Sequence, residues 1–396
     1  MKTKVIHIIT MLEMGGAQSN TLFTVEHLDR DKFEVGLISG PGGILDDSAR
    51  KIKNLKLEFV SNLVRPISPF KDFLCLLNLI KILKREKPDI VHTHSSKAGI
   101  LGRLAARAAQ VPLIIHSIHG FGFNPYQKFF VRWLFIFLEK FIAKFTHVLI
   151  AVSQENIEQG LRLRIGGGGQ REQYVLIRSG VDIESIRSQA QAADLPALRK
   201  SFNISANAPV VLSAGPFKLQ KDPVSFIEMA GRVLQEVPNA VFLWSGDGEL
   251  RPQVEAKIRS LKIENSLRLL GWRQDIPTLL ALCDVFVLTS LWEGLPRAAV
   301  EALILGKPVA AFAVDGIPEV VREGENGFLL KSGDLEGLSQ KIALLLKDAA
   351  LRKRLGESAL KTINNSFDIH SMVKSQEKVY LGDFGARQRT KSEHTE

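Results

Sequence analysis

The sequence predicts an α/β protein built from two doubly wound parallel sheets. Short runs of aliphatic and β-branched residues alternate with longer helical patterns along nearly all of the 396 residues. This alternation is typical of parallel strands joined by crossover helices. The chain is too long for one ordinary core, so two domains of about 180 residues each are the natural division.

The first domain, residues 1–180, is expected to contain seven strands. They are predicted near residues 4–9, 34–38, 57–60, 89–93, 113–117, 147–151 and 174–178. The second domain, residues 181–366, is expected to contain six, near residues 209–213, 240–244, 267–270, 284–288, 308–312 and 327–330. Ligands of such sheets bind beyond the carboxyl ends of the strands, so the loops there are expected to face one central cleft.

Two segments lie outside this plan. A helix over residues 367–384 is expected to return to the first domain, and the charged residues 385–396 are expected to form a disordered tail. The four glycines at 166–169 resemble a phosphate-binding loop only in composition. No strand leads directly into them and no lysine–serine pair follows, so they are interpreted as a flexible connector.

The positive charge is confined to the first half of the chain. Of the 52 Lys+Arg and 42 Asp+Glu residues, 25 and 15 lie in residues 1–180, which leaves 27 of each in the remainder. Such a basic half requires an anionic partner, and nucleic acid, acidic phospholipid and a pyrophosphate-linked lipid are the candidates. The two cysteines, Cys75 and Cys283, lie in separate apolar runs, and no signal-peptide pattern opens the chain. Both observations favour the cytoplasm.

Two glutamates eight residues apart, Glu293 and Glu301, form the most informative pattern. They follow a predicted buried strand, and a helix is expected to begin with Pro296 in its first turn. The amides at the start of such a helix, with those of Gly294 and Leu295, can bind a phosphate. Carboxylates accept hydrogen bonds from hydroxyl groups, so an anion site flanked by two of them predicts a nucleotide sugar as ligand.

The surrounding motifs strengthen this interpretation. The segment Gly306–Ala310 is typical of the start of a strand. A second turn from a strand to a helix is predicted at Asp315–Val321, and its Gly316 lies where the backbone must come close to a ligand. With these motifs the chain resembles the family 4 (GT4) retaining glycosyltransferases of bacterial surface-polysaccharide synthesis. That resemblance extends from about residue 4 to about residue 384. It implies the GT-B fold, in which two Rossmann-like domains face a central cleft.

The resemblance assigns the donor-binding residues of the second domain. It implies that Glu301 holds the ribose diol and that Glu293 binds a hydroxyl group of the transferred sugar. The segment after the first strand of this domain is similar to the family's G-R-x4-K motif, with Lys221 as its lysine. Pro216 replaces the arginine, so either Lys218 substitutes for it or the diphosphate receives one cation fewer. In both cases the bidentate geometry of arginine is lost.

Two further loops of the second domain follow predicted strands. Gly246 lies in a Gly-Asp-Gly turn, and Trp272 and Arg273 follow Gly271. Turn glycines would account for both loops. In the family, backbone atoms at positions like those of Trp272 and Arg273 bind the uracil base.

Three residues of the first domain are assigned in the same way. Gly15 and Gly16 follow the first strand and open a helix, where missing side chains let backbone amides approach a phosphate. A tight turn would also explain them, but the family places such a loop beside the donor diphosphate and the acceptor. His119 matches a family histidine that contacts the donor sugar.

No metal site is predicted. His92, His94 and His116 end neighbouring strands, but no acidic residue or cysteine lies among them at ligand spacing, so they are interpreted as structural. Asp29-Arg-Asp31 matches a D-x-D motif, but it lies at the amino end of a strand and reads as a surface turn. A metal-independent reaction without a cofactor is expected.

The segment 126–145 combines aromatic residues with cations. Seven of its residues are Phe or Trp, among them Trp133. Its cations are Lys128, Arg132, Lys140 and Lys144. The longest apolar run is too short to span a bilayer. A buried core helix is one interpretation. The other interpretation is an interfacial helix that contacts an anionic membrane, because four buried cations would be costly. The segment 70–87, which is also cationic and apolar, would assist this membrane contact.

The sequence therefore predicts a retaining glycosyltransferase. It would move a sugar from a nucleoside diphosphate sugar, with UDP as the first choice, to a lipid-linked or polysaccharide acceptor at the inner face of the plasma membrane. A non-hydrolysing sugar-nucleotide 2-epimerase is an alternative, but it would have no use for the basic aromatic surface. A nucleic-acid-binding protein is another, although no recognition helix or aromatic-basic strand motif is visible.

Overall fold

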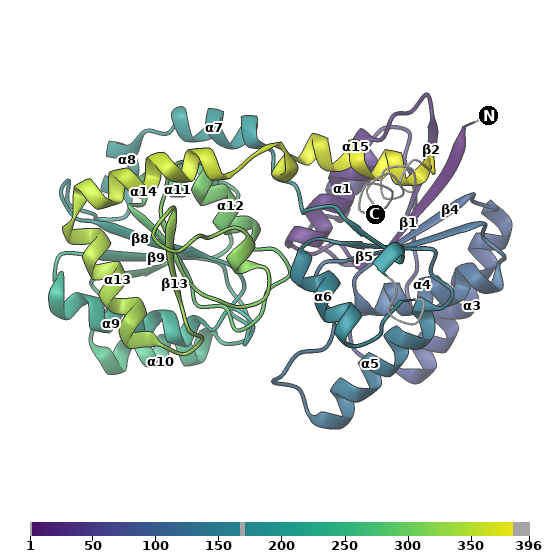
Figure 1. Ribbon diagram of the computed structural model, residues 1–396, viewed down its shortest axis with the longest axis horizontal. Helices are drawn as coiled ribbons and strands as arrows, with labels where there is room; N and C mark the ends of the chain where they lie inside the picture. Colours follow the sequence, from purple (N-terminus) through teal and green to yellow (C-terminus); the bar gives the residue numbers. More distant parts are fainter. Residues whose placement is uncertain (1, 167–170, 383–396) are drawn as a thin grey trace, which may run out of the picture. The chain divides into compact units, whose positions relative to one another are not determined.

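The computed structural model describes residues 2–166 and 171–382. The chain forms two compact units, one of Met1–Gly180 with Ile369–Glu396 and one of Val181–Asp368 (Figure 1). Most of the glycine-rich connector and all of the predicted tail 385–396 lie outside the described residues.

The first unit is organised around a seven-stranded parallel sheet of order β3-β2-β1-β4-β5-β6-β7. Its strands are β1 (Thr3–Met11), β2 (Phe33–Gly40), β3 (Lys56–Phe59), β4 (Ile90–His94), β5 (Leu113–Ile118), β6 (Val148–Ala151) and β7 (Tyr174–Leu176). Its helices are α1 (Gly16–His27), α2 (Asp46–Lys51), α3 (Pro69–Glu86), α4 (Ser96–Ala108), α5 (Phe129–Ala143), α6 (Gln154–Arg162) and α15 (Ile369–Tyr380).

Alternation along the strands divides the helices between the two faces of this sheet. In β1, Val5 and Ile9 pack into a cluster with residues of α1 and α15, whereas Ile6 and Ile8 pack against α3 and α4. Successive strand residues point to opposite faces, and both faces here are apolar, as expected for a parallel sheet covered on both sides. The C-terminal helix α15 therefore contributes to the core of the first unit, beside α1.

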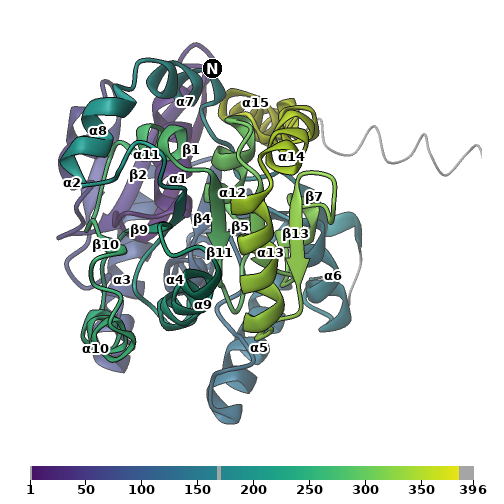
Figure 2. The ribbon, with the colours of Figure 1, turned by 90° about the vertical axis from the view of Figure 1, so that its left-hand side faces the viewer.

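The second unit contains a six-stranded parallel sheet of order β10-β9-β8-β11-β12-β13. Its strands are β8 (Val210–Ala214), β9 (Val241–Ser245), β10 (Leu267–Leu269), β11 (Val285–Leu288), β12 (Val309–Phe312) and β13 (Gly327–Leu330). Its helices are α7 (Ile183–Gln191), α8 (Leu195–Ser201), α9 (Pro223–Glu236), α10 (Arg251–Leu261), α11 (Ile276–Leu282), α12 (Arg297–Ile304), α13 (Leu335–Lys347) and α14 (Ala349–Thr362). Helices α9 and α13 pack side by side on one face (Figure 2).

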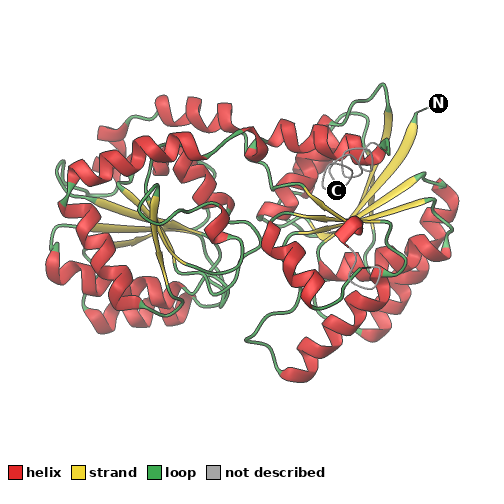
Figure 3. Cartoon of the chain, in the orientation of Figure 1, coloured by secondary structure: helices red, strands yellow, loops and turns green. Residues whose placement is uncertain are grey.

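The predicted fold class is confirmed, because each sheet is parallel and strands and helices alternate along both units (Figure 3). Within the described residues, the structure has a strand at each of the thirteen predicted positions. Two helices have boundaries that differ from the prediction, and the first is α15, which spans Ile369–Tyr380 and not residues 367–384. Pro296 is not in the first turn of a helix: its ψ of 85° is outside the helical range, so it forms the N-cap and α12 begins at Arg297.

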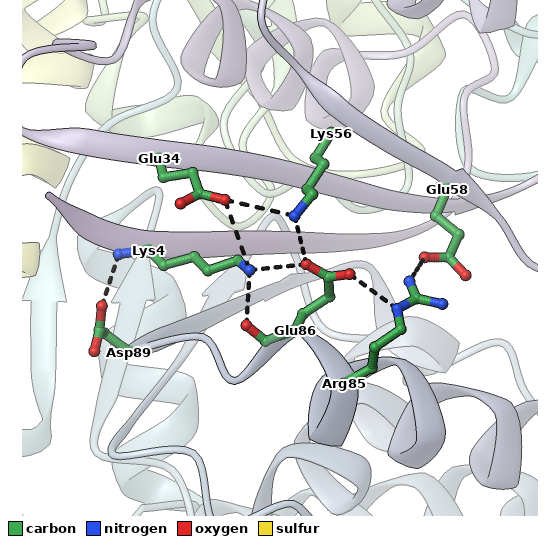
Figure 4. Close-up of polar contacts among 7 residues, drawn as sticks. All are labelled: Lys4, Glu34, Lys56, Glu58, Arg85, Glu86 and Asp89. Atoms are coloured by element: carbon green, nitrogen blue, oxygen red, sulfur yellow. Dashed lines mark hydrogen bonds and ion pairs between the residues drawn. The ribbon is translucent and has the colours of Figure 1, made fainter.

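A charged network closes the first sheet at the amino ends of its strands (Figure 4). The Glu86 carboxylate, at the end of α3, accepts hydrogen bonds from Lys4 and Lys56, each at 2.8 Å, and from Arg85 at 2.9 Å. These three cations, with Lys4 contributing most, lower the pKa of Glu86 to about 2. The network thus stabilises the amino ends of the strands, whereas ligands of such folds bind beyond the carboxyl ends.

Candidate active site

Two loops of the second unit are joined at the carboxyl ends of neighbouring strands. The first follows β8 and leads into α9, and the second follows β11 and leads into α12. The Leu291 amide donates to the Gln220 carbonyl at 2.8 Å, and the Thr289 hydroxyl donates to the Lys221 carbonyl at 3.0 Å. These bonds hold the predicted lysine segment and the predicted glutamate segment together.

Lys221 and Glu293 form an ion pair at the centre of these loops. The Glu293 side chain is 7% exposed and that of Lys221 is 17% exposed. The Ser290 hydroxyl donates to the same Glu293 oxygen at 2.8 Å, and the Glu293 amide donates to Asp315 at 2.8 Å. Each charge therefore fixes the other in position before any ligand binds.

The stem of Lys221 lies against Gly215 at the end of β8. A Cβ atom at Gly215 would lie 3.2 Å from Lys221 Cε, and the φ of Gly215 is 150°. A larger residue here would therefore press on the lysine as well as strain the backbone. This contact explains why a glycine begins the motif that ends in lysine.

Glu301 lies on the first turns of α12. Its carboxylate is 3.7 Å from the guanidinium of Arg297, one helical turn earlier, and both side chains are mostly buried. Burial raises the pKa of Glu301, while the positive charge of Arg297 opposes this change. The i,i+4 spacing of Arg297 and Glu301 was visible in the sequence, although Arg297 was not among the predicted site residues. Ser290 and Asp315 were also missed, because only the tertiary structure brings them to Glu293.

The glycine turns after β9 and β10 contact each other. The Gly246 amide donates to the Gly271 carbonyl at 2.7 Å. A Cβ atom at Gly246 would lie 1.9 Å from the Gly215 carbonyl oxygen, so this position has no room for a side chain. Trp272 is 47% exposed, and Arg273 donates two hydrogen bonds to Asp275, at 2.8 and 2.6 Å. The Arg273 guanidinium group is therefore held by a side chain of its own loop.

The remaining predicted residues of the second unit have different environments. Gly294, Leu295 and Pro296 are buried directly before α12. Lys218 is partly exposed and forms no ion pair within the described residues. It is therefore available to bind an anion, whereas Lys221 is already paired.

The first unit has a pocket of about 360 Å³ at the carboxyl end of β1. Gly15 precedes α1 and Gly16 is its first residue, and their neighbours Glu13 and Gln18 line the pocket. The other polar lining residues are Thr10, Arg65, Asp72, Ser95, Ser96 and Lys97. The apolar lining residues are Met11, Ile67, Ile100, Leu101, Leu134, Phe135 and Leu138. One cavity thus combines polar side chains with apolar ones, most of which come from α4 and α5.

Histidines gather on one face of the first sheet. Nitrogen atoms of His7, His92 and His94 lie within 4.8 Å of one another, a spacing that could hold a metal ion. Burial lowers the pKa of His7 to about 3 and those of His92 and His94 well below the usual value, so these rings are neutral. His7 was not predicted. It lies directly opposite His92 in the parallel register of β1 and β4.

His116 and the D-x-D segment lie outside this cluster. His116 is buried on the other face of the sheet, where its Nδ1 contacts the Thr93 hydroxyl at 2.9 Å. Asp29, Arg30 and Asp31 form the turn between α1 and β2. The Asp29 amide donates to Glu377 of α15 at 2.8 Å, and its carboxylate pairs with Lys32 at 2.9 Å.

Helix α5 presents an aromatic surface and is not a core helix. Only Glu139, Ile142 and Ala143 of this helix are buried. Its exposed apolar residues are Phe129, Phe130, Val131, Trp133, Leu134, Phe137 and Phe141. The four predicted cations of this segment are also exposed. Phe70, Phe73 and Leu77 of α3 are exposed too. No helix within residues 2–166 and 171–382 is long and apolar enough to cross a bilayer.

Comparison with known proteins decides the family. The model of the group 1 glycosyl transferases matches residues 194–362, and that of glycosyltransferase family 4 matches residues 14–185. A UDP-Gal:α-D-GlcNAc-diphosphoundecaprenol α-1,3-galactosyltransferase from Escherichia coli is 35% identical over 96% of this chain and 97% of its own length. This chain is a family 4 glycosyltransferase.

Other relatives agree with this assignment. An N,N'-diacetylbacillosaminyl-diphospho-undecaprenol α-1,3-N-acetylgalactosaminyltransferase from Campylobacter jejuni is 30% identical over 79% of the glycosyltransferase and 83% of its own length. The crystal structure of HepE from Anabaena with UDP and glucose has a TM-score of 0.82 at 22% identity, over 96% of this chain and 100% of HepE. That likeness shows the shared fold. The matches favour the transferase over the predicted alternatives, the epimerase and the nucleic-acid-binding protein.

Proposed function

We propose that this glycosyltransferase moves a sugar, with retention of configuration, from a UDP-sugar to a sugar carried on a lipid diphosphate. The buried Lys221–Glu293 pair at the carboxyl ends of β8 and β11 is the observation that carries the proposal. It places a cation suited to a departing diphosphate beside a carboxylate suited to a sugar hydroxyl. The name of the Escherichia coli relative supports UDP-galactose as the first donor to test.

Each proposed donor contact has its own chemistry. Glu301 binds the ribose hydroxyls, Glu293 binds a hydroxyl of the sugar, and Lys221 with Lys218 stabilises the charge of the leaving diphosphate. The amides of Gly294 and Leu295, with the N-cap Pro296 and the start of α12 behind them, add further donors. The turns at Gly246, Trp272 and Arg273 provide backbone contacts to the base. In the first unit, Gly15 and Gly16 approach phosphate and His119 binds a sugar hydroxyl.

The acceptor is proposed to bind in the pocket of the first unit. Its apolar lining from α4 and α5 suits the start of a lipid chain, and its polar lining suits a phosphate or a sugar. The two cations of this lining are already partnered, since Arg65 pairs with Glu13 at 2.5 Å and Lys97 with Asp72 at 2.6 Å. An arriving phosphate would therefore compete with two carboxylates, which favours a diphosphate over a single negative charge.

The exposed surface of α5 is proposed to attach the enzyme to the cytoplasmic face of an anionic membrane. Exposed aromatic residues beside exposed cations are typical of helices that lie at a lipid interface. Each cation near such a surface contributes about 1 kcal/mol, so Lys128, Arg132, Lys140 and Lys144 together support reversible, salt-sensitive binding. Trp133 and its aromatic neighbours would insert between the headgroups, beside the apolar lining of the acceptor pocket.

Calorimetry with UDP and transfer assays with UDP-galactose test the donor. We expect UDP to bind and UDP-galactose to be consumed when a GlcNAc-diphospholipid is added. A matched titration with ADP and GDP identifies the base preference. Failure of UDP to bind the folded protein would exclude the proposed donor.

Sedimentation with vesicles tests the membrane surface. Changing the four cations of α5 to glutamine should abolish binding to anionic vesicles at low salt and leave UDP affinity unchanged. Removal of four exposed lysines from the second unit provides a control with the same loss of charge. These are Lys262, Lys331, Lys353 and Lys361. Equal losses in both variants would show a general charge effect rather than a specific surface.

A further inference from the structure

A continuous chain of polar contacts runs through the buried face of the first sheet. We call it the histidine chain, and its members in order are His119, His94, His7, Tyr380, His92 and Ser117. They come from the end of β5, from β4 and β1, and from the C-terminal helix α15. The proposed function uses only its first member.

The successive contacts are all within hydrogen-bonding distance. His119 Nε2 lies 3.3 Å from His94 Nδ1, and His94 Nε2 lies 3.0 Å from His7 Nδ1. The Tyr380 hydroxyl lies 3.4 Å from His7 Nε2 and 2.6 Å from His92 Nδ1. His92 Nε2 lies 2.8 Å from the Ser117 hydroxyl. His7, His92 and His94 therefore each use both ring nitrogens.

A neutral imidazole donates at one nitrogen and accepts at the other. In a chain where each ring uses both, the direction of a single hydrogen bond fixes all the others. The three buried histidines are neutral, because burial lowers their pKa values. The hydrogen positions along the whole chain thus follow from one contact.

The contact between Tyr380 and His92 supplies that direction. A separation of 2.6 Å is typical of an O–H donor and short for an N–H donor, so the phenol donates to His92 Nδ1. The other acceptor near this hydroxyl, Gln376 Oε1, is farther away at 3.4 Å. His92 must then donate to Ser117 through Nε2, and the oxygen of Tyr380 must accept from His7 Nε2.

We propose that the histidine chain positions His119 by fixing its proton on Nε2, so that Nδ1 presents a lone pair. The same direction places the proton on Nε2 in His94, His7 and His92. Given the proposed role of His119 in the transferase, an accepting Nδ1 is suited to the hydrogen of a sugar hydroxyl. His94, His7, Tyr380 and His92 are then positioning residues that act through His119.

A metal ion at the three clustered histidines would require a different arrangement. A metal takes the lone pair of one nitrogen of each ring, and that nitrogen can no longer join the chain. His92 has hydroxyl partners at both nitrogens, Tyr380 and Ser117, which favours hydrogen bonds over metal binding. Metal analysis separates the two arrangements.

The tautomers can be measured by long-range ¹H–¹⁵N NMR on the full chain labelled at histidine, with signals assigned by single His→Gln variants. We expect Nε2–H at all four histidines of the chain. His116 provides an internal contrast. Its Nδ1 lies 3.1 Å from the Thr93 carbonyl, and the Thr93 hydroxyl, 2.9 Å from the same nitrogen, donates to the Ile115 carbonyl, so we expect Nδ1–H at His116. An Nδ1–H form at His94 or His7, or one equivalent of bound metal in the purified protein, would overturn the proposal.

The variant Tyr380→Phe removes the hydroxyl that sets the direction. We expect a mixture of tautomers at His119 and a threefold to tenfold lower kcat for UDP-galactose, with UDP affinity changed less than twofold. Tyr174→Phe is the matched control, because this other buried tyrosine of the unit donates to the Ile165 carbonyl outside the chain. If the two variants have the same kcat and the same His119 spectrum, the histidine chain has no positioning role.

Ser117→Ala is a second variant that removes the last acceptor with a smaller change in packing. It should shift the His92 signals and lower kcat, as Tyr380→Phe does. An unchanged spectrum would contradict the proposed direction of the hydrogen bonds. The NMR measurements need no substrate. A protein with the expected tautomers that neither binds UDP nor transfers a sugar would therefore refute the proposed function and leave the histidine chain standing.

Discussion

Removing the cation from the Lys221–Glu293 pair should destabilise the second unit strongly. In Lys221→Met the Glu293 carboxylate, only 7% exposed, would keep its hydrogen bond from Ser290 but lose its counter-charge. Breaking a buried pair by removing one partner costs about 3–5 kcal/mol. Because the Lys221 side chain is 17% exposed, we expect the free energy of unfolding to fall by about 3 kcal/mol, the lower end of this range.

A double-mutant cycle separates this penalty from lost packing. Adding Glu293→Gln to Lys221→Met removes the uncompensated charge and keeps a group that can accept from Ser290. The double variant should recover about 2 kcal/mol of the loss. Denaturant unfolding followed by tryptophan fluorescence is a suitable assay, because three of the four tryptophans, Trp244, Trp272 and Trp292, lie in the second unit.

If Lys221→Met and the double variant unfold at the same denaturant concentration at pH 7, the pair is not energetically coupled. The proposed fixing of each charge by the other would then be refuted.

Three further predictions concern the donor site, metal dependence and the first sheet. Glu301→Ala should weaken UDP binding about tenfold to a hundredfold in calorimetry, because hydrogen bonds to a charged group contribute about 1.5–3 kcal/mol, whereas Glu336→Ala on the surface of α13 should bind normally. Transfer should persist in excess EDTA, and loss of activity that magnesium or manganese restores would show a metal requirement. The pKa of Glu86, lowered to about 2 from 4.5, implies stability that is present above about pH 4.5 and lost as the pH falls toward 2. Glu86→Gln should flatten the stability curve in that window and cost about 1–3 kcal/mol at pH 7, and a curve like that of the wild type would exclude this contribution.

The sequence by itself determined the fold class and suggested where the proposed donor-side residues lie along the chain. Strand positions could be predicted because parallel strands buried on both faces are continuous apolar runs, a local signal that needs no knowledge of neighbours. Glu293 and Glu301 could be proposed as site residues for a related reason, and the resemblance to the family added Lys221. All three follow such strands, and the carboxyl ends of parallel strands lie together at one end of a sheet.

The tertiary structure decided which of these residues contact each other. The partners Ser290 and Asp315 come to Glu293 through loops whose conformation depends on bonds between segments, such as that from Leu291 to Gln220. The exposure of α5 was also undecided, because an aromatic helix has the same local pattern whether a neighbour covers it or not.

The histidine chain is the strongest case of this kind. His7 and Tyr380 are separated by 373 residues, and neither belongs to a recognisable motif. They meet because β1 and β4 pair in one register and because α15 returns to the first unit, where the side chain of Tyr380 is buried against that face of the sheet. Sequence patterns report local preferences, whereas hydrogen bonds between distant strands and helices depend on how the whole unit packs.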